Sequence, residues 1–210
     1  MKSKSVFDKY YKEYDAWYEK KRFVYLSELK ALKKVLPKRG AKGLEIGVGT
    51  GRFASRLGVT SGVEPSRNMA RIAKRRGINV KIGFGERLPY KREEFDYVII
   101  IISLCFVKNP RKVLGEAARV LKKRGKLIIG IVDKHSFLGK FYRKKKSVFY
   151  KKARFFGVKE LDGLLKKKGF DKFSYSQTIF KLPHELKKVE TPRKGFGKGG
   201  FVVIACRKMS

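Results

Sequence analysis

The residues best suited to chemistry lie in one stretch, GLEIGVGTG at residues 43–51. Three of its glycines, Gly47, Gly49 and Gly51, alternate with other residues after a short apolar run, and an apolar helical pattern follows. Glycines let the backbone approach a ligand where a Cβ atom would clash, and a helix start offers unpaired N–H groups to polar ligand atoms. The stretch therefore predicts a strand, a ligand-binding turn and a helix, the first half of a nucleotide-binding βα unit.

An acidic residue, Glu64, follows a second short apolar run at residues 59–63 and lies seventeen residues after Gly47. In nucleotide-binding βα units, a carboxylate about 20 residues beyond the glycine-rich turn binds the ribose hydroxyls. We therefore expect Glu64 to bind a ribose. The alternative is an acid in a solvated loop that binds no ligand.

The spacing of the glycines differs from the dinucleotide fingerprint G-x-G-x-x-G, because the third glycine comes one residue early and Glu45 stands two residues before the first. The pattern E-x-G-x-G-x-G resembles the first motif of class I S-adenosylmethionine-dependent methyltransferases, in particular small-molecule enzymes with a methyltransferase type 11-like domain. The resemblance implies an α/β fold with a doubly wound, mostly parallel seven-stranded sheet whose last strand is antiparallel. It also implies S-adenosylmethionine as the cofactor.

A second stretch, GFGERLPY at residues 83–90, resembles the G-D-A-E-x-L-P-F loop that frames the adenine in this family. Phe84 stands where the family usually has Asp, so the usual acceptor for the adenine amino group is missing, and Phe84 could stack on the ring instead. The cofactor-binding residues that the resemblance implies are Tyr14, Glu45, Gly47, Gly49, Gly51, Glu64, Pro65, Met69, Gly85, Glu86 and Ser103.

Residues 6–36 precede the first strand and show apolar and aromatic residues at helical spacing, which predicts helix as far as Pro37. Tyr10, Tyr14 and Asp15 match a Y-x-x-x-Y-D-x-W segment that covers the sulfonium in many small-molecule methyltransferases. Two interpretations stay open here: the aromatic stripe forms a lid over the cofactor, or it packs against the sheet.

Further short apolar runs predict strands at residues 78–82, 95–103, 127–132, 173–180 and 200–206, with helical patterns between them. The end of the 95–103 run should lie beside the first glycine turn, at the switch point where ligands bind. We expect one domain, residues 1–210, which comprises a helical lid (1–37), a cofactor-binding half (43–133) and a substrate-side half (134–210).

The methyl acceptor is not encoded in any motif. Methyl transfer from a sulfonium is an in-line displacement, so a general base is needed only if the acceptor must lose a proton. We assign no catalytic residue, and the substrate-side candidates are Tyr10, Tyr142 and His135, of which His135 follows the fifth predicted strand.

Other chemistries have weaker support. Cys105 suggests the nucleophile of cytosine-C5 RNA methyltransferases, but that family places Pro before its cysteine and Leu104 stands here, so we favour a buried thiol. The N-P-P-[YF] tetrad of exocyclic-amine methyltransferases is replaced by SLCF at residues 103–106. No residues have the spacing of metal ligands, so we expect no metal.

The net charge is +36, from 54 Lys and Arg against 18 Asp and Glu, and such a field attracts polyanions. Residues 134–156 carry nine basic residues interleaved with aromatics, which suits single-stranded nucleic acid or a solvated helix over the acceptor. The favoured function is methyl transfer to a small molecule. The alternatives are an RNA- or ribosome-directed methyltransferase and a non-catalytic basic module that binds nucleic acid.

The chain opens with charged and aromatic residues rather than a signal peptide, and its longest apolar run, residues 97–107, is too short to span a bilayer. The two cysteines lie in apolar, strand-like runs and are typical of buried thiols in a reduced compartment. These observations predict a cytoplasmic protein with no membrane span.

Overall fold

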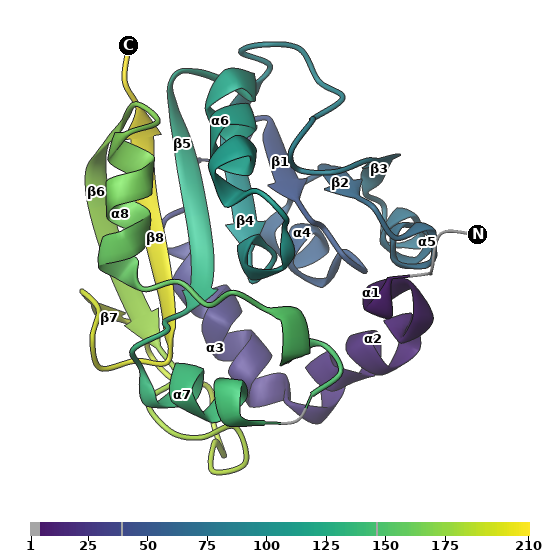
Figure 1. Ribbon diagram of the computed structural model, residues 1–210, viewed down its shortest axis with the longest axis vertical. Coiled ribbons are helices and arrows are strands. Elements are labelled where there is room, and N and C mark those ends of the chain that lie inside the picture. The colour runs from purple at the N-terminus through teal and green to yellow at the C-terminus, as the bar shows by residue number, and fades with distance from the viewer. Residues whose placement is uncertain (1–4, 39, 146) are drawn as a thin grey trace.

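The computed structural model describes residues 5–38, 40–145 and 147–210 and contains one eight-stranded sheet of order β3-β2-β1-β4-β5-β8-β6-β7 (Figure 1). The strands are β1 (Gly43–Ile46), β2 (Ser61–Glu64), β3 (Asn79–Ile82), β4 (Phe95–Ile101), β5 (Leu121–Val132), β6 (Phe170–Thr178), β7 (Arg193–Lys194) and β8 (Phe201–Lys208). The helices are α1 (Val6–Lys9), α2 (Tyr11–Lys20), α3 (Arg22–Lys33), α4 (Arg52–Leu57), α5 (Arg67–Arg75), α6 (Pro110–Val120), α7 (Phe137–Lys144) and α8 (Val158–Lys166), with 3-10 turns η1 (Leu104–Phe106) and η2 (Tyr150–Lys152).

The strand pairing confirms the doubly wound, mostly parallel sheet with an antiparallel last strand. Strands β3, β2, β1, β4 and β5 pair in parallel, and β8 runs antiparallel to both β5 and β6. The predicted number of seven strands is wrong by one, because the two-residue strand β7 adds to the outer edge of β6. Two residues in a Pro- and Gly-rich connection are too few to show the period-2 pattern that marks a strand.

Helices cover both faces of the sheet, and strand β4 contributes to the core on each side. Ile99 and Ile101 pack in one core with residues of α3 and α4, whereas Val98 and Ile100 pack in the other with residues of α6 and α8. Successive side chains of a strand point to opposite faces, so the uninterrupted apolar run of β4 is what a strand buried on both faces requires. In Figure 1, α6 and α8 lie in front of the sheet and α3 and α4 behind it.

Several predicted boundaries are wrong. The predicted N-terminal helix is three helices, because Tyr10 (φ −109°) and Lys21 (φ −119°) leave helical geometry. Strand β5 begins at Leu121, six residues before the predicted start at Leu127, and pairs there with Phe95. Cys105 lies in the 3-10 turn η1 rather than in a strand, because β4 ends at Ile101.

Helix α2 is held to the helices that follow β1 and β2 through the carboxylate of Asp15. The Arg52 guanidinium donates to Asp15 with N–O distances of 2.8 and 3.0 Å, and the Arg76 guanidinium with distances of 2.7 and 2.8 Å. Burial alone would raise the pKa of Asp15, but the hydrogen bonds from Arg76 and Arg52 lower it well below its usual range. We call this arrangement of Asp15, Arg52 and Arg76 the Asp15 clasp.

Replacing Asp15 by Asn should lower the free energy of unfolding at neutral pH by about 1–3 kcal/mol, the scale of a hydrogen bond to a charged group. Because folding lowers the pKa of Asp15, this stability is present above the unfolded carboxyl's pKa and is lost as the pH falls below it. Urea denaturation measures the change. Glu19→Gln is the matched control, since Glu19 also pairs with Arg52 but its side chain is 70% exposed; equal losses in both variants would contradict a special role for Asp15.

The N-terminal helices lie across the end of the sheet where the parallel strands finish. In Figure 1, α1, α2 and α7 border this lower end, where β5 leads into α7. Asp8 in α1 accepts hydrogen bonds from the Ser66 hydroxyl (2.7 Å) and the Asn68 backbone N–H (3.1 Å) at the start of α5. None of the helices in the described ranges has the length and apolarity that crossing a membrane needs.

Candidate cofactor and acceptor site

The glycine turn between β1 and α4 has the backbone geometry that its sequence predicts. Gly47, Gly49 and Gly51 have φ values of 72°, 56° and 80°, in the left-handed region that side chains disfavour. A Cβ atom on Gly47 would lie 2.6 Å from the Ser103 Cβ, and one on Gly51 would lie 3.0 Å from the Ala73 Cβ. The turn is therefore packed tightly on two sides, and only glycine fits at these positions.

Glu64 lies at the end of β2, beside this turn. It is 5% exposed, and its two carboxylate oxygens accept hydrogen bonds from the backbone N–H groups of Gly49 (3.0 Å) and Ser66 (2.9 Å). Burial raises the pKa of Glu64 to about 7, although the two N–H groups oppose the shift. The alternative of a solvated loop acid is wrong, since the carboxylate is buried and bound to the turn itself.

A second buried carboxylate, Glu45, comes from β1. It is 2% exposed, and its Oε2 atom has no hydrogen-bond partner within the part of the chain that the structure describes. Burial raises the pKa of Glu45 well above its usual range, and the Ala54 N–H opposes the shift. A buried, unpaired acceptor beside the glycine turn suits a ligand with hydrogen-bond donors, and the hydroxyls and ammonium group of S-adenosylmethionine fit that requirement.

Three other predicted cofactor-binding residues, Pro65, Met69 and Gly85, are divided between the core and the surface. Met69 is buried, Pro65 is exposed, and Gly85 is so close to Ile46 that an added Cβ would lie 2.9 Å from its Cγ2 atom. The Phe84 ring is 65% exposed, so a planar group such as adenine has room to stack on it.

Glu86, predicted beside the cofactor, has a different partner in the structure. Its Oε1 atom accepts hydrogen bonds from the backbone N–H groups of Lys108 (3.0 Å) and Asn109 (3.2 Å), just before α6. Its carboxylate therefore fixes the start of that helix.

Aromatic side chains from four segments lie together beside the glycine turn. The Tyr14 ring lies 3.6 Å from where a Cβ of Gly49 would be, and rings from α1, η1 and residue 149 surround it. Ring centroids are 5.9 Å apart for Phe7 and Tyr14, 4.8 Å for Phe7 and Phe106, and 5.9 Å for Tyr14 and Phe149. We call Phe7, Tyr10, Tyr14, Phe106 and Phe149 the aromatic cluster; the sequence analysis singled out only Tyr10 and Tyr14 as site residues.

The residues of the N-terminal stripe divide between the core and the glycine turn. Tyr18 is 5% exposed and belongs to the core, against which Trp17 packs, whereas Tyr14 covers the glycine turn. The two tyrosine hydroxyls are 2.8 Å apart, so the covering residue and the core residue are hydrogen-bonded. The helix is therefore a cover for the turn and part of the core at once.

The carboxyl end of β4 reaches the turn as predicted. The Ser103 hydroxyl donates to the Ile46 carbonyl (2.9 Å) and faces Gly47. Ile102 has φ 53°, which is rare for a β-branched residue and marks strain at this edge. Burial raises the pKa of Cys105 to about 12, so its thiol is not available as a nucleophile at neutral pH.

The acceptor-side candidates are separated in the structure. His135 is exposed at the start of α7, with its ring against the backbone of Gly157. Tyr142 is buried, and its ring centroid lies 4.8 Å from that of Tyr150. Tyr10 is half-buried beside Phe149 (6.3 Å). The structure thus places both tyrosines among other rings and His135 on the surface.

The sequence motifs do not include Glu28 in α3, which the structure shows to be a buried acid. It is 2% exposed, and burial raises its pKa to about 8. A signal was present: Glu28 is four residues after Val24 and four before Leu32, so it lies on the helix face that these buried residues define.

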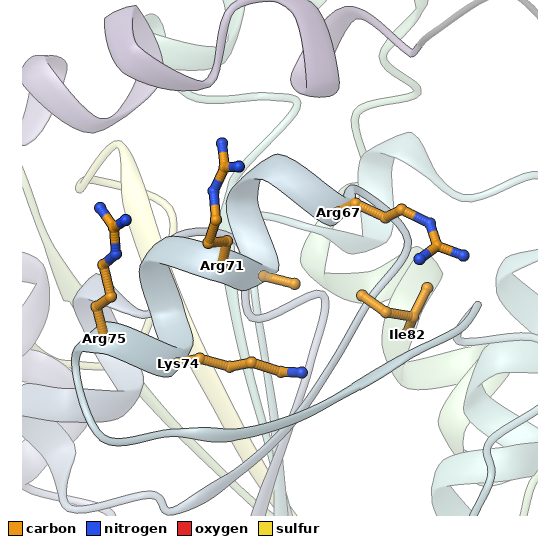
Figure 2. A pocket seen from close by; sticks show the side chains of 6 residues that line it. Arg67, Arg71, Lys74, Arg75 and Ile82 are labelled. Atoms are coloured by element: carbon orange, nitrogen blue, oxygen red, sulfur yellow. The ribbon is translucent and has the colours of Figure 1, made fainter.

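An open hollow on the outer face of α5 lies away from the glycine turn. Arg67, Arg71, Lys74 and Arg75 line it together with Ile82 from β3. Figure 2 shows Arg67 extending over Ile82, with the other basic side chains spaced along the helix. We call these four basic residues the α5 basic face.

Comparison with known proteins gives consistent matches. The family model described as methyltransferase domain matches residues 44–129, which contain the glycine turn and Glu64. An uncharacterized protein of Methanocaldococcus jannaschii is 51% identical over 207 residues, which are 98% of this chain and 100% of the relative. A crystal structure from Thermotoga maritima, described as an S-adenosylmethionine-dependent methyltransferase and possible histamine N-methyltransferase, is 51% identical with a TM-score of 0.94. That match covers 97% of this chain and 98% of the Thermotoga chain.

Proposed function

The chain belongs to the class I S-adenosylmethionine-dependent methyltransferases and uses S-adenosylmethionine as its methyl donor, and we propose that it methylates a small molecule. The observation that supports a small acceptor is the aromatic cluster, in which Tyr14 lies over Gly49 of the turn and the other rings pack on Tyr14 and Phe7. A small molecule can be enclosed beneath such a cover. The membership also sets aside the non-catalytic alternative, since the family is one of enzymes.

In this proposal the cofactor binds along the carboxyl edge of β1, β2 and β4. The backbone of the glycine turn lies against it, Glu64 accepts from its ribose hydroxyls, and Tyr14 covers it. When bound, S-adenosylmethionine supplies a methyl group that its positive sulfur has already activated. The protein's own task is then to orient the acceptor and keep water out. The full proposed set is Tyr14, Glu45, Gly47, Gly49, Gly51, Glu64, Pro65, Met69, Gly85 and Ser103, with Glu86 acting only through the loop that it fixes.

We further propose that the three parts predicted from the sequence form one domain, with residues 1–37 as the lid. The Asp15 clasp supports this, because it joins α2 to α4 and α5. The description of the Thermotoga relative as a possible histamine N-methyltransferase supports a nitrogen atom of a small molecule as the methyl acceptor.

An RNA acceptor is the second candidate, and the α5 basic face together with the exposed Phe84 ring is the observation in its favour. Cationic side chains beside an exposed ring are typical of single-stranded nucleic acid sites. A chain of charge +36 will bind RNA in any case, so binding alone does not identify the acceptor.

Incubation of the protein with cell extract and methyl-labelled S-adenosylmethionine tests the proposal. We expect label in the small-molecule fraction and none in RNA at physiological salt. Changing the α5 basic face to Glu should weaken RNA binding about tenfold or more, because four charges that can pair with phosphates are reversed, and should leave small-molecule labelling intact, because these side chains line the outer hollow and not the glycine turn. The control is a change to Glu of Lys30 and Lys33 in α3 and of Lys34 directly after it. Labelled RNA that disappears in the α5 variant alone would replace the small-molecule proposal with the RNA candidate.

A further inference from the structure

Ser66, the residue directly before α5, contacts both the proposed cofactor site and the N-terminal helix α1. It is 3% exposed, and its backbone N–H donates to the Glu64 carboxylate (2.9 Å). Its hydroxyl donates to the Asp8 carboxylate of α1 (2.7 Å) and accepts from the Met69 N–H (3.2 Å). One buried serine therefore joins two carboxylates from distant parts of the chain. We call Asp8, Ser66 and Glu64 the Ser66 bridge.

Asp8 also connects α1 to the first turn of α5. Its carboxylate accepts from the Asn68 backbone N–H (3.1 Å), and its carbonyl accepts from the Asn68 side-chain amide (3.0 Å). In Figure 1, α1 accordingly lies next to α5. No residue of α1, Val6–Lys9, is buried. Elements with few buried contacts open at a low cost in free energy, so α1 can separate from α5 while the rest of the fold stays intact.

Opening of α1 uncovers the aromatic cluster. The Phe7 ring of α1 packs on Phe106 and Phe149 with centroid distances of 4.8 and 5.5 Å. The chain leaves helical geometry at Tyr10 (φ −109°), between α1 and α2, and the Asp15 clasp holds α2 in place. Helix α1 can therefore pivot at Tyr10 and lift Phe7 without breaking the clasp. This movement gives a small acceptor a route to the rings beside the glycine turn.

The two carboxylates of the Ser66 bridge repel each other when both are ionised, because like charges lie on either side of one residue. Burial raises the pKa of Glu64 to about 7, and the charge of Asp8 adds to that shift. The repulsion favours the separation of α1 from α5. Ligand hydroxyls that donate to Glu64 offset the field of its charge at Asp8, so a ligand bound there favours the closed position of α1.

We propose that Ser66 is a positioning residue that couples the closing of α1 over the acceptor to the binding of the cofactor ribose at Glu64. The inference rests on the proposed cofactor site. An acceptor enters while α1 is open, and the closed helix then covers it with Phe7 and excludes water. The coupling ensures that α1 closes mainly when a cofactor is bound. Because coupling between two sites is reciprocal, the closed position of α1 also tightens the binding of the cofactor.

Hydrogen–deuterium exchange followed by mass spectrometry tests this coupling in the full chain, with S-adenosylhomocysteine as the ligand. The N–H groups of Asp8, Lys9 and Tyr10 are hydrogen-bonded within α1. A helix of this length is not stable alone, so these groups exchange whenever α1 leaves α5. Saturating S-adenosylhomocysteine should slow their exchange about fivefold or more, the usual lower end of coupling between two sites.

Two variants each remove one side of the Ser66 bridge and keep the backbone N–H that Glu64 accepts from. In Asp8→Ala and Ser66→Ala, S-adenosylhomocysteine should still bind, but about fivefold or more weakly, and should no longer slow exchange in α1. Ser66→Ala also loses the N-terminal cap of α5, so Asp8→Ala is the decisive variant.

Two controls separate the hydrogen bonds of the bridge from charge alone. Asp8→Asn keeps an oxygen that can accept the same hydrogen bonds, and it should retain the slowing of exchange. Glu13→Ala removes an exposed acid of the neighbouring helix α2, and it should behave like the wild-type protein.

The outcomes separate the inference from the function on which it rests. Failure of the wild-type protein to bind S-adenosylhomocysteine would count against the proposed function. Normal binding without slower exchange in α1, or slowing that persists in Asp8→Ala, would overturn the role of the Ser66 bridge alone. Loss of the slowing in Glu13→Ala as well would show a general effect of charge and would also overturn that role.

Discussion

Glu28→Gln is expected to be more stable than the wild-type protein at alkaline pH and nearly equal to it at pH 5. Folding raises the pKa of Glu28 from its ordinary value of 4.5 to about 8 through burial. A raised pKa gives stability that is present below the unfolded pKa and is lost as the pH rises through the folded one. At about 1.36 kcal/mol for each pKa unit, the wild-type protein should lose several kcal/mol, at most about 5, between pH 4.5 and pH 8 relative to a variant that cannot ionise.

Urea denaturation at a series of pH values from 5 to 9 measures this difference. The gap between the two free energies of unfolding should widen steadily above pH 5 and level off above pH 8. Glu190→Gln is the control and should run parallel to the wild type, because the Glu190 carboxylate accepts a hydrogen bond from the Phe180 N–H (2.8 Å). If the Glu28→Gln curve were also parallel, Glu28 would not be a buried acid whose pKa is raised by folding.

Gly49→Val is expected to reduce the affinity for S-adenosylhomocysteine by at least about 100-fold, or ~3 kcal/mol. A β-branched residue is strained at φ 56°, and its Cβ would already lie 3.6 Å from the Tyr14 ring before any methyl group is added. The side chain would displace Tyr14 or fill the space of the ligand. It would also disturb the N–H group that Glu64 accepts from.

The matched control is Gly77→Val. Gly77 has φ 82°, so the substitution carries a similar backbone strain, but nothing lies within 4 Å of the added Cβ. Both variants should melt at lower temperature, whereas only Gly49→Val should lose affinity in calorimetry. Equal loss of affinity in the two variants would show that general destabilisation, rather than contact at the turn, is responsible.

Short sequence patterns predicted those elements whose conformation depends mainly on residues close to them in the chain. The glycine turn, the acid at the end of β2 and the buried strand β4 are all read from short stretches, and the structure confirms their placement. Whether the predicted residues bind the cofactor stays a prediction until Gly49 and its neighbours are tested.

The features that the sequence did not reveal depend on segments far apart in the chain. Glu28 is buried because α3 packs against distant elements such as β6, and no local pattern shows that packing. Phe106 and Phe149 join Tyr14 for the same reason. The short strand β7 exists because β6 offers an open edge, and the residues of β7 carry no strand pattern of their own.

The Asp15 clasp also has a kinetic consequence. Arg52 begins the helix after the glycine turn and Arg76 caps the helix after Glu64, so one carboxylate joins the two segments that border the proposed cofactor. A spent cofactor leaving past α2 must first break these four hydrogen bonds. Salt screens ion pairs that are partly exposed and so weakens these bonds. The rate at which spent cofactor exchanges for fresh cofactor should therefore rise with added salt, even where the rate of the methyl-transfer step is unchanged.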